Sequence, residues 1–333
     1  TPPPLKLAYP LQMNYESGGL KDLVSTDSLS RADVEMLLDT AAIYAKDPLR
    51  DSKFLANQTV VIYMNKASTR TRLASETAVA HLGGTPIFVR GDELQIGRGE
   101  TLPDTAKVIS GFAKAMIIRT YAQSDVAELA KHASIPIINA LTDDDHPTQL
   151  LADWVTIREV FGKDLSGRKF TYVGDGNNMA NAWLLMGAIL GVHVVAATPT
   201  GEWAPDEKII ERAKKIASQS GGKVEVIHDA KVGATGASVL YTDVWMSMGD
   251  SEVIREKKIK DLSPFAITEE LMSLTAPDAV FMHCLPAHRG EEVSAEVMDG
   301  ARSIVWREAF HRRTTIQALL FHLIRGDLKG STW

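Results

Sequence analysis

The chain has 333 residues, of which 45% are hydrophobic, and it carries a formal net charge of −6 with a pI of about 5.9. A chain of this length buries a large core and favours two compact domains over one. Its acidic balance gives no reason to expect binding to nucleic acid or to an anionic membrane, so a strong anion site has to be local. The sequence contains no apolar run of the roughly 18 residues that a membrane span needs.

Cys284 is the single cysteine of the sequence, which excludes an internal disulfide and fits a reducing compartment. The chain begins Thr-Pro-Pro-Pro, without an apolar signal core or the arginine-rich composition of a transit peptide. We therefore expect a cytoplasmic protein, or a mitochondrial matrix protein if the chain is eukaryotic and a leader has been removed. We expect the first dozen residues to be disordered.

Short apolar runs alternate with longer amphipathic ones, which is typical of buried strands separated by covering helices. In the first half, this pattern predicts strands at residues 60–64, 86–89, 115–118 and 135–139. It predicts helices over residues 70–81, from Ser124 as a cap to residue 133, and over residues 147–161.

The second half repeats the alternation. Strands are predicted at residues 170–173, 192–197, 224–227, 239–241 and 280–283. One helix is predicted over residues 179–190, another is predicted to open at Pro205, and a final amphipathic helix is predicted from about residue 314 to residue 324. Regular alternation of strand and helix indicates parallel sheets covered on both faces. We predict an α/β fold in which two doubly wound parallel-sheet domains are joined by interdomain helices.

The predicted domains are residues 1–150 and residues 151–309, and the last helix, bounded at 310–325, is expected to pack back on the first domain. The stretch 163–168, which has Gly162 before it and Gly167 inside it, is the natural seam between the two α/β units.

Residues 68–72 read Ser-Thr-Arg-Thr-Arg and lie between a predicted strand and a predicted helix. A helix N-terminus offers free backbone N–H groups and the positive end of a dipole, so it binds anions. Three hydroxyls and two arginines at such a place indicate a phosphate site. The alternative is ordinary helix capping by Ser68 or Thr69, with arginines that face solvent.

Two further segments carry polar side chains at the ends of predicted elements. Arg119 follows a predicted strand, and in open α/β sheets ligands gather at the carboxyl ends of strands; the alternative is a surface arginine. Residues 146–149 read His-Pro-Thr-Gln, where the proline suits a first helical turn, so that His146 and Gln149 can face one ligand. A structural histidine is the alternative. The nine histidines show no HxH or HExxH spacing, which disfavours a metal site.

In the second half, residues 174–178 read Gly-Asp-Gly-Asn-Asn between a strand and a helix. This is similar to a dinucleotide-binding loop, but Met179 occupies the position of the last glycine, so the signal is weak. Asp243 follows a predicted strand and can bind an amine or a nearby cysteine, or it can cap a helix. Cys284 ends a buried strand, where a cysteine is commonly a small hydrophobic residue.

Taken together, these segments resemble the aspartate/ornithine carbamoyltransferase superfamily, and specifically its ornithine branch. The sequences Asp-Val-Trp-Met-Ser-Met-Gly at 243–249 and His-Cys-Leu-Pro-Ala at 283–287 belong to the same resemblance, which extends from about residue 20 to residue 323. It implies transfer of a carbamoyl group from carbamoyl phosphate to the side-chain amine of L-ornithine, giving L-citrulline and phosphate. It implies no metal and no organic cofactor.

The resemblance also implies roles for individual residues. Residues 1–150 would bind carbamoyl phosphate, and residues 151–309 would bind ornithine. The residues implied for the phosphate are Ser68, Thr69, Arg70, Thr71, Arg119 and Arg312, and those for the carbamoyl group are His146, Gln149, Cys284 and Leu285. Those implied for ornithine are Asn178, Asp243, Ser247 and Met248, and the catalytic set is Cys284, Arg119, His146 and Asp243. Gln95 is placed like a residue that such enzymes donate to a neighbouring subunit, which implies a homotrimer with shared sites.

Two departures from the family pattern bear on the acceptor. The family commonly reads Glu-Ala-Glu-Asn-Arg near the C-terminus, whereas this chain has Phe310 and His311 before Arg312, and Ala67 replaces a common proline. Other acceptors therefore stay open, namely lysine, putrescine or an acylated ornithine. A relative that binds carbamoyl phosphate without catalysis and a dinucleotide-dependent oxidoreductase are the alternatives from other classes.

Overall fold

The computed structural model describes residues 19–94, 96, 99–246 and 251–333. Gln95, Ser247 and Met248 lie outside the described residues, as does the proline-rich start of the chain, so what the sequence predicts for them stays a prediction.

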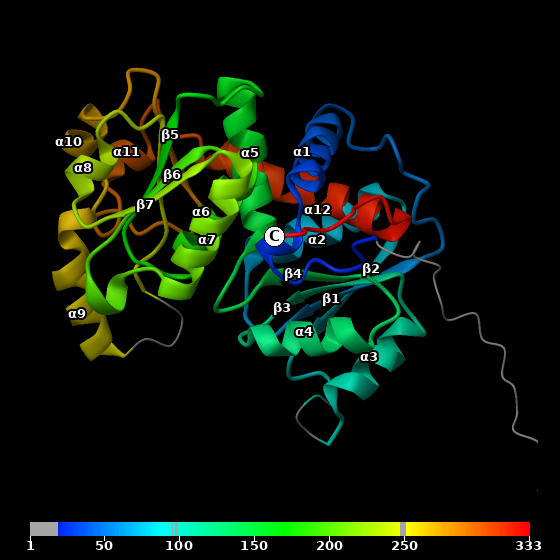
Figure 1. Ribbon diagram of the computed structural model, residues 1–333. Coiled ribbons are helices and arrows are strands. Elements are labelled where there is room, and N and C mark those ends of the chain that lie inside the picture. The colour runs from blue at the N-terminus through cyan, green and yellow to red at the C-terminus, as the bar shows by residue number, and fades with distance from the viewer. Residues whose placement is uncertain (1–18, 95, 97–98, 247–250) are drawn as a thin grey trace, which may run out of the picture.

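Two parallel sheets in separate lobes form the framework (Figure 1). The first sheet has the order β2-β1-β3-β4 and is built from β1 (Thr59–Met64), β2 (Thr85–Arg90), β3 (Ala115–Arg119) and β4 (Ile137–Leu141). The second has the order β7-β6-β5-β8-β9 and is built from β5 (Lys169–Val173), β6 (His193–Ala197), β7 (Lys223–Ile227), β8 (Val239–Thr242) and β9 (Val280–His283). Every strand pairing recorded between these elements is parallel, as the alternating pattern predicts.

Helices cover both faces of each sheet, because successive strand side chains point to opposite sides. In β1, Val60, Ile62 and Met64 enter one core, whereas Val61 and Tyr63 enter another. The first core is shared with α1 (Arg31–Lys46), α2 (Thr69–His81), α5 (Pro147–Phe161) and α12 (Val305–Arg325), and the second is shared with α3 (Leu102–Ser110) and α4 (Gln123–His132).

The second sheet is covered in the same way. Its strands pack on α6 (Asn178–Leu190) and α7 (Glu207–Ser220) on one side, and on α8 (Ala230–Ala234), α10 (Glu269–Ser273) and α11 (Ala295–Met298) on the other. The remaining elements are α9 (Glu252–Leu262) and the 3₁₀ turns η1 (Thr26–Ser28), η2 (Gly201–Trp203) and η3 (Ser263–Phe265). The doubly wound α/β prediction is confirmed for both lobes.

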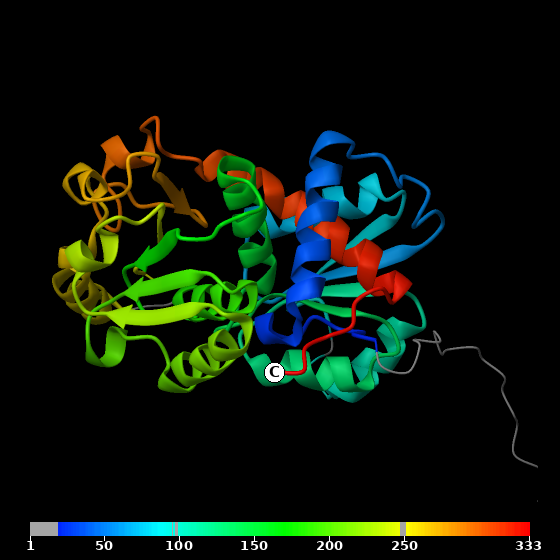
Figure 2. The ribbon, with the colours of Figure 1, turned by 45° about the horizontal axis from the view of Figure 1, so that its top comes forward.

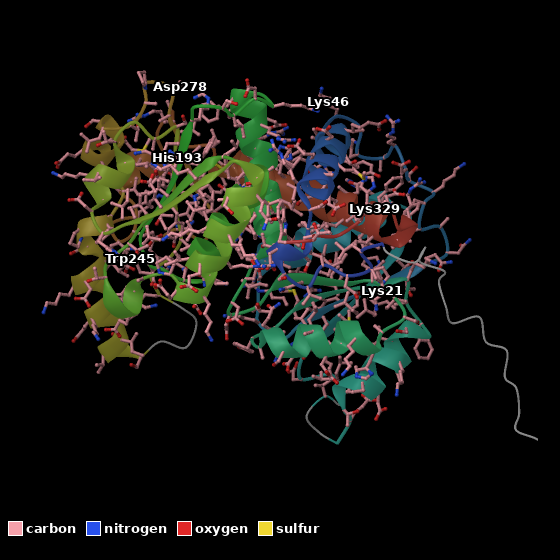
Figure 3. All side chains as sticks on the ribbon, in the orientation of Figure 1. Lys21, Lys46, His193, Trp245, Asp278 and Lys329 are labelled. Carbon is pink, nitrogen blue, oxygen red and sulfur yellow. The ribbon has the colours of Figure 1, made fainter. Side chains whose placement is uncertain are left out.

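Two helices hold the lobes together. α12 leaves the second lobe and packs along α1, α2 and α5 (Figure 2). The indole of Trp154 on α5 stacks on Trp183 of α6 with ring centroids 5.5 Å apart and meets Phe170 of β5 at 5.0 Å. One apolar core therefore runs from the helices of the first lobe into the second, and the side chains fill both lobes (Figure 3).

Four predicted boundaries are wrong, each for a local reason. Ser124 does not cap α4, because the helix begins at Gln123 with Ala122 as its N-cap. Strand β4 begins at residue 137 rather than 135, since Pro136 has no N–H for the ladder. Helix α7 is capped by Asp206, which accepts the N–H of Lys208, so that Pro205 precedes the helix instead of opening it.

The fourth wrong boundary is the start of α12, which begins at Val305 and not near residue 314. Its first turns bury polar side chains, among them Glu308 and Arg312, and hydrophobic periodicity does not register such a helix. None of the helices in the described part of the chain combines the length and apolar composition needed to span a membrane.

Candidate functional site

A cavity of about 490 Å³ lies between the two domains, where the carboxyl ends of strands from both sheets meet. Ligand sites in open α/β sheets occur at such edges. The predicted site residues that line it are Ser68, Thr69, Arg70, Arg119, His146, Gln149, Asn178, Asp243, Cys284, Leu285 and Arg312. Thr71 does not line the cavity; it is buried beneath it, where its hydroxyl accepts a hydrogen bond from Arg312.

The first turn of α2 forms one wall. Ser68 is the N-cap, and its hydroxyl accepts from the backbone N–H of Thr71 at 3.3 Å and donates to the Thr71 hydroxyl at 3.2 Å. Because Ser68 both caps the helix and lines the cavity, the two interpretations of this motif are not exclusive. The positive end of α2 thus opens into the cavity and favours an anion there.

Three guanidiniums converge on the same wall. Arg312 from α12 donates to the Gln149 carbonyl oxygen at 2.6 Å and to Thr71 at 3.1 Å, and Arg119 at the end of β3 donates to the backbone oxygen of Lys66 at 3.2 Å. Arg70 completes the group. Within the described part of the chain, no ion pair joins any of these three arginines to a carboxylate.

Burying these arginines close together lowers their pKa values. Burial, with Arg312 and Arg70 close by, lowers the pKa of Arg119 to about 10. Burial also lowers the pKa of Arg312 to about 10, although Asp153 opposes the change. All three stay charged at neutral pH, and a dianion is the ligand that best relieves their mutual repulsion.

His146 is buried at the N-terminus of α5 and has no capping bond from its side chain. Its backbone N–H donates to Asp145 Oδ1 at 2.7 Å, which fixes the start of the helix. Burial, together with the charges of Arg312 and Arg119, lowers the pKa of His146 well below its ordinary value. The imidazole is therefore neutral, and it can donate one hydrogen bond without adding another charge to the arginine cluster.

The opposite wall of the cavity comes from the second sheet. The Cys284 thiol after β9 donates to Asp243 Oδ1 at 2.9 Å, and Asn177, the N-cap of α6, donates to Asp243 Oδ2 at 2.9 Å. Burial and the neighbouring Asp243 carboxylate raise the pKa of Cys284 well above its ordinary value. Cys284 is thus a neutral thiol, and this environment does not activate it as a covalent nucleophile.

Backbone contacts fix the loops that carry these side chains. The Lys258 ammonium donates to the carbonyl oxygen of Trp245 at 2.7 Å and forms an ion pair with Asp175 at 3.1 Å. Leu285 has a positive φ of 62°, and its N–H donates to His283 Nδ1 at 2.8 Å. Asn178 reaches across the cleft and donates to the backbone oxygen of Thr142 in the first domain at 2.9 Å. The cavity is therefore bounded by both domains and bridged at Asn178.

Asp243, His283 and Cys284 have the composition of a metal-ligand set, and their ligand atoms lie within 4.8 Å of one another. Each of these side chains is already engaged, however. The imidazole of His283 contacts Leu285 through Nδ1 and Glu292 through Nε2, and the Cys284 thiol donates to Asp243. These hydrogen bonds explain why the three side chains lie close together.

Several lining residues were not predicted from the sequence. Lys66 follows β1 and forms an ion pair with Asp143 at 3.0 Å, and a lysine next to the Ser-Thr-Arg-Thr motif could have been recognised as a fourth cation. Asn177 is not among the predicted site residues, whereas its neighbour Asn178 is. Its position just before a predicted helix is a signal, because Asn is a preferred N-cap residue. His288 and Met246 line the cavity as well; Met246 lies within the 243–249 motif, whereas His288 has no local signal.

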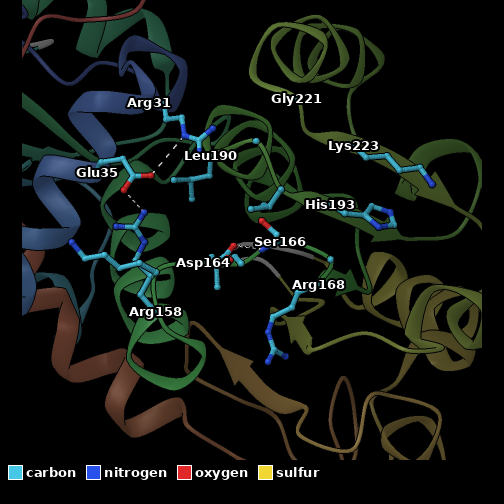
Figure 4. Close-up of a pocket in the computed structure, with 15 residues that line it drawn as sticks. Arg31, Glu35, Arg158, Asp164, Ser166, Arg168, Leu190, His193, Gly221 and Lys223 are labelled. Atoms are coloured by element: carbon cyan, nitrogen blue, oxygen red, sulfur yellow. Dashed lines mark hydrogen bonds and ion pairs between the residues drawn. The ribbon is translucent and has the colours of Figure 1, made fainter.

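A second cavity, of about 380 Å³, lies at the junction of the two domains (Figure 4). None of the predicted site residues lines it. Its basic side chains have acidic partners: Arg31 and Arg158 contact Glu35, Lys163 contacts Asp39, Arg168 contacts Asp278, and both Lys223 and His193 contact Glu225. Because these charges are already compensated, this cavity offers no counterpart to the unpaired arginine cluster.

Comparison with known proteins finds similar chains over almost the whole length. Residues 21–159 match the family described as aspartate/ornithine carbamoyltransferase, carbamoyl-P binding domain, and residues 166–323 match its Asp/Orn binding domain. The chain is 44% identical over 318 residues to an ornithine carbamoyltransferase of Oceanobacillus iheyensis, covering 94% of this chain and 98% of the relative. It is 42% identical over 311 residues to an anabolic ornithine carbamoyltransferase of Pyrococcus furiosus, with coverage of 93% and 98%. The solved structure of ornithine carbamoyltransferase from Pyrococcus furiosus has a TM-score of 0.87 at 41% identity, covering 93% of this chain and 98% of that one.

The hydrogen bond between Cys284 and Asp243 predicts the reactivity of the thiol. Asp243→Asn removes a negative charge that raises the pKa of Cys284, so the pH profile of thiol alkylation should move to lower pH by about one pH unit or more. Mass spectrometry after timed exposure to iodoacetamide measures this directly, because the chain has one cysteine. The control is Asp278→Asn, on the remote Arg168 ion pair, which should leave the profile unchanged. Coincident profiles for Asp243→Asn and the wild type would contradict the assignment.

Proposed function

Because the chain belongs to the aspartate/ornithine carbamoyltransferase family, we propose that it transfers the carbamoyl group of carbamoyl phosphate to the side-chain amine of L-ornithine, giving L-citrulline and phosphate. The observation that supports this most strongly is one cavity whose first wall carries three guanidiniums that no described carboxylate pairs with, and whose other wall carries the Asp243–Cys284 pair. The first wall suits a phosphate dianion, and the second suits an amine.

At the phosphate end, Arg70, Arg119 and Arg312 bind the dianion together with the hydroxyls and the N-terminal turn of α2. Guanidinium is suited to this because its planar fork pairs two phosphate oxygens at once. The same charges stabilise phosphate as it departs, so the leaving group needs no proton from the protein.

At the carbamoyl group, neutral His146 donates to the oxygen that becomes negative when the amine attacks. The side-chain nitrogen forms a bond to the carbamoyl carbon, the bond from that carbon to the phosphate oxygen breaks with its electron pair, and the amine loses a proton to the departing phosphate. Loss of one oxyanion donor typically costs roughly 3–4 kcal/mol of barrier. The remaining acceleration comes from holding two substrates in line within one cleft.

At the acceptor end, Asp243 takes the α-ammonium of ornithine, and the neutral Cys284 thiol contacts the attacking amine without becoming acylated. Asn178 binds the α-carboxylate in place of its contact with the Thr142 backbone oxygen. Ser247 and Met248 extend this wall in the proposal and close over the methylene chain of the amino acid.

The two unusual residues before Arg312 do not change this assignment. Phe310 is partly exposed and stacks between Arg307 and Arg313, and His311 is buried against Glu159 at 2.9 Å. Neither residue lines the cavity, so their departure from the family pattern gives no reason to prefer another acceptor.

We assign residues 1–150 to carbamoyl phosphate and residues 151–309 to ornithine, and we propose a homotrimer in which Gln95 reaches a neighbouring site. The buried free thiol supports a reducing compartment, and we propose the cytoplasm, or the mitochondrial matrix for a eukaryotic chain.

Arg70 and His146 should affect different kinetic constants. Arg70→Ala removes charge from the ground-state phosphate and should raise the KM for carbamoyl phosphate, whereas His146→Ala should mainly lower kcat, since oxyanion charge develops in the transition state. Steady-state kinetics measures both. Arg72→Ala is the matched control, because Arg72 lies on the same helix, pairs with Glu76 and does not line the cavity. An unchanged kcat in His146→Ala, with only the KM altered, would contradict the separate roles assigned to Arg70 and His146.

The acceptor is tested by kcat/KM for ornithine, lysine, putrescine and N-acetylornithine at saturating carbamoyl phosphate. Ornithine should be preferred; lysine, with one more methylene, should lose about 1–3 kcal/mol of transition-state binding. Putrescine should be much worse, because it leaves the α-carboxylate donors unpaired. The rate should rise with pH while the reacting ammonium is the limiting group. A preference for any other amine in the panel would overturn the acceptor assignment and leave the carbamoyl phosphate site intact.

Subunit sharing is tested by complementation. Gln95→Ala and Arg119→Ala chains should each be inactive alone, and mixing them should restore activity in hybrid sites that take both wild-type residues. Native mass spectrometry of the mixture confirms that hybrids form. Hybrids without any citrulline production would show that each site belongs to one chain.

A further inference from the structure

Two helices that meet behind the cavity carry a buried pair of carboxyl groups. Gln149 and Asp153 lie four residues apart on α5, and Glu308 and Arg312 lie four residues apart on α12, so both pairs present one helical face. The helices pack together, and all four side chains are 2% exposed or less.

The Gln149 amide is the link between this pair and the cavity. Its nitrogen donates to Asp153 Oδ1 at 2.8 Å and to Glu308 Oε1 at 3.0 Å, and its oxygen accepts from Arg312 at 2.6 Å. Each end of the amide therefore has its own partners, and a reversed amide would set oxygen against two carboxyl groups and nitrogen against a guanidinium. The carboxyl pair thereby orients Gln149, and Gln149 orients Arg312.

The hydrogen bonds also indicate where a proton is needed. Glu308 accepts from the Tyr241 hydroxyl at 3.3 Å and from the backbone N–H of His283 at 2.9 Å, in addition to Gln149. Asp153 Oδ2 is buried and finds no donor within the described residues. Glu308 and Asp153 both accept from the same Gln149 nitrogen, so the two carboxyl groups lie close together, and two buried carboxylates in such a position repel each other unless one of them carries a proton.

Charge balance leads to the same conclusion. The charged and titratable groups that face the pair are Arg312 from α12, Arg70 from α2, Tyr241 from β8 and Cys284 after β9. Tyr241 and Cys284 are neutral, since burial raises the pKa of each well above its ordinary value. Of the two arginines, Arg312 is the one for which the described residues show hydrogen bonds within this network, so one negative charge is compensated and a second is not.

We propose that Asp153 and Glu308 share one proton and, as positioning residues, orient the Gln149 amide and the Arg312 guanidinium for carbamoyl phosphate. Burial raises the pKa of Asp153 to about 7, and burial together with Asp153 raises the pKa of Glu308 well above its ordinary range. The one-proton state therefore outlasts the pH range in which an ordinary carboxyl group keeps its proton, and it ends at the pH where that last proton leaves. Above it, a second buried negative charge beside Gln149 disturbs the network that holds Arg312.

The shared proton is tested without substrate, by the infrared C=O stretch of a protonated carboxylic acid at mildly alkaline pH. Wild-type protein should show the band, and both Asp153→Asn and Glu308→Gln should lose it, because either neutral isostere leaves the other group ionised. Asp22→Asn is the control: Asp22 is partly buried, but its pKa is raised only to about 6, so it is ionised under these conditions. Absence of the band in wild type, or its survival in either single variant, would overturn the proposal.

The positioning role rests on the proposed function and is tested by the pH dependence of the KM for carbamoyl phosphate. Asp153→Ala should raise that KM about tenfold at mildly alkaline pH, because it frees the Gln149 amide, whereas Asp153→Asn should stay within about threefold of wild type. The wild-type KM should rise as the shared proton is lost, and that rise should be absent from Asp153→Asn. Superimposable wild-type and Asp153→Asn profiles would refute the positioning role. The infrared result does not depend on which amine is the acceptor, so the two proposals can fail separately.

Discussion

Three guanidiniums, of which Arg312 is buried and the other two are partly buried, have no carboxylate partner among the described residues and are the constraint around which the cavity is built. Bringing like charges out of water is costly, and burial lowers the pKa of Arg119 and Arg312 to about 10. The fold keeps the cluster together by delivering each arginine from a different element: the first turn of α2, the end of β3 and the middle of α12. The packing of α12 on α1, α2 and α5 offsets that cost and brings Arg312 from the far end of the chain to the first domain.

The cavity is electrostatically asymmetric, and the asymmetry orients the substrates. Every recorded hydrogen-bond partner of the Asp243 carboxylate is neutral: the Cys284 thiol, the Asn177 amide and the backbone N–H of Val244. Its negative charge is therefore available to a cationic ligand, just as the charge of the arginines is available to an anionic one. A phosphate at one end and an ammonium at the other are the arrangement that this field favours. The neutral His146 and Cys284 allow the reacting groups to meet between the two charged ends.

The sequence predicted all nine strands that the structure describes, because each contains a short apolar run that the hydrophobic pattern alone can identify. Helix α1 is not among the predicted helices, although Ser30 and Asp33 form a capping box that is visible in the sequence. The early start of α12 could not be predicted from hydrophobicity, since its first turns bury polar residues.

The residues that form the two walls were found by motif and resemblance, but their partners were not. Asn177 contacts Asp243 from 66 positions away, and Arg312 contacts Gln149 from 163 positions away. Contacts between residues so far apart in the sequence depend on how the two sheets and α12 pack together, and no local sequence pattern encodes them. For the same reason the Asp153–Glu308 pair shows in the sequence only as one acidic residue on each of two helices.

The central claim is that the arginine cluster is the binding site for carbamoyl phosphate, and calorimetric titration of that ligand tests it most directly. Wild type should be compared with Arg119→Gln and with Arg90→Gln, an exposed arginine at the end of β2 that does not line the cavity. Loss of a hydrogen bond to a charged group costs about 1.5–3 kcal/mol, so Arg119→Gln should weaken binding roughly tenfold or more. Arg90→Gln should bind like wild type. Equal affinity of wild type and Arg119→Gln would contradict the account.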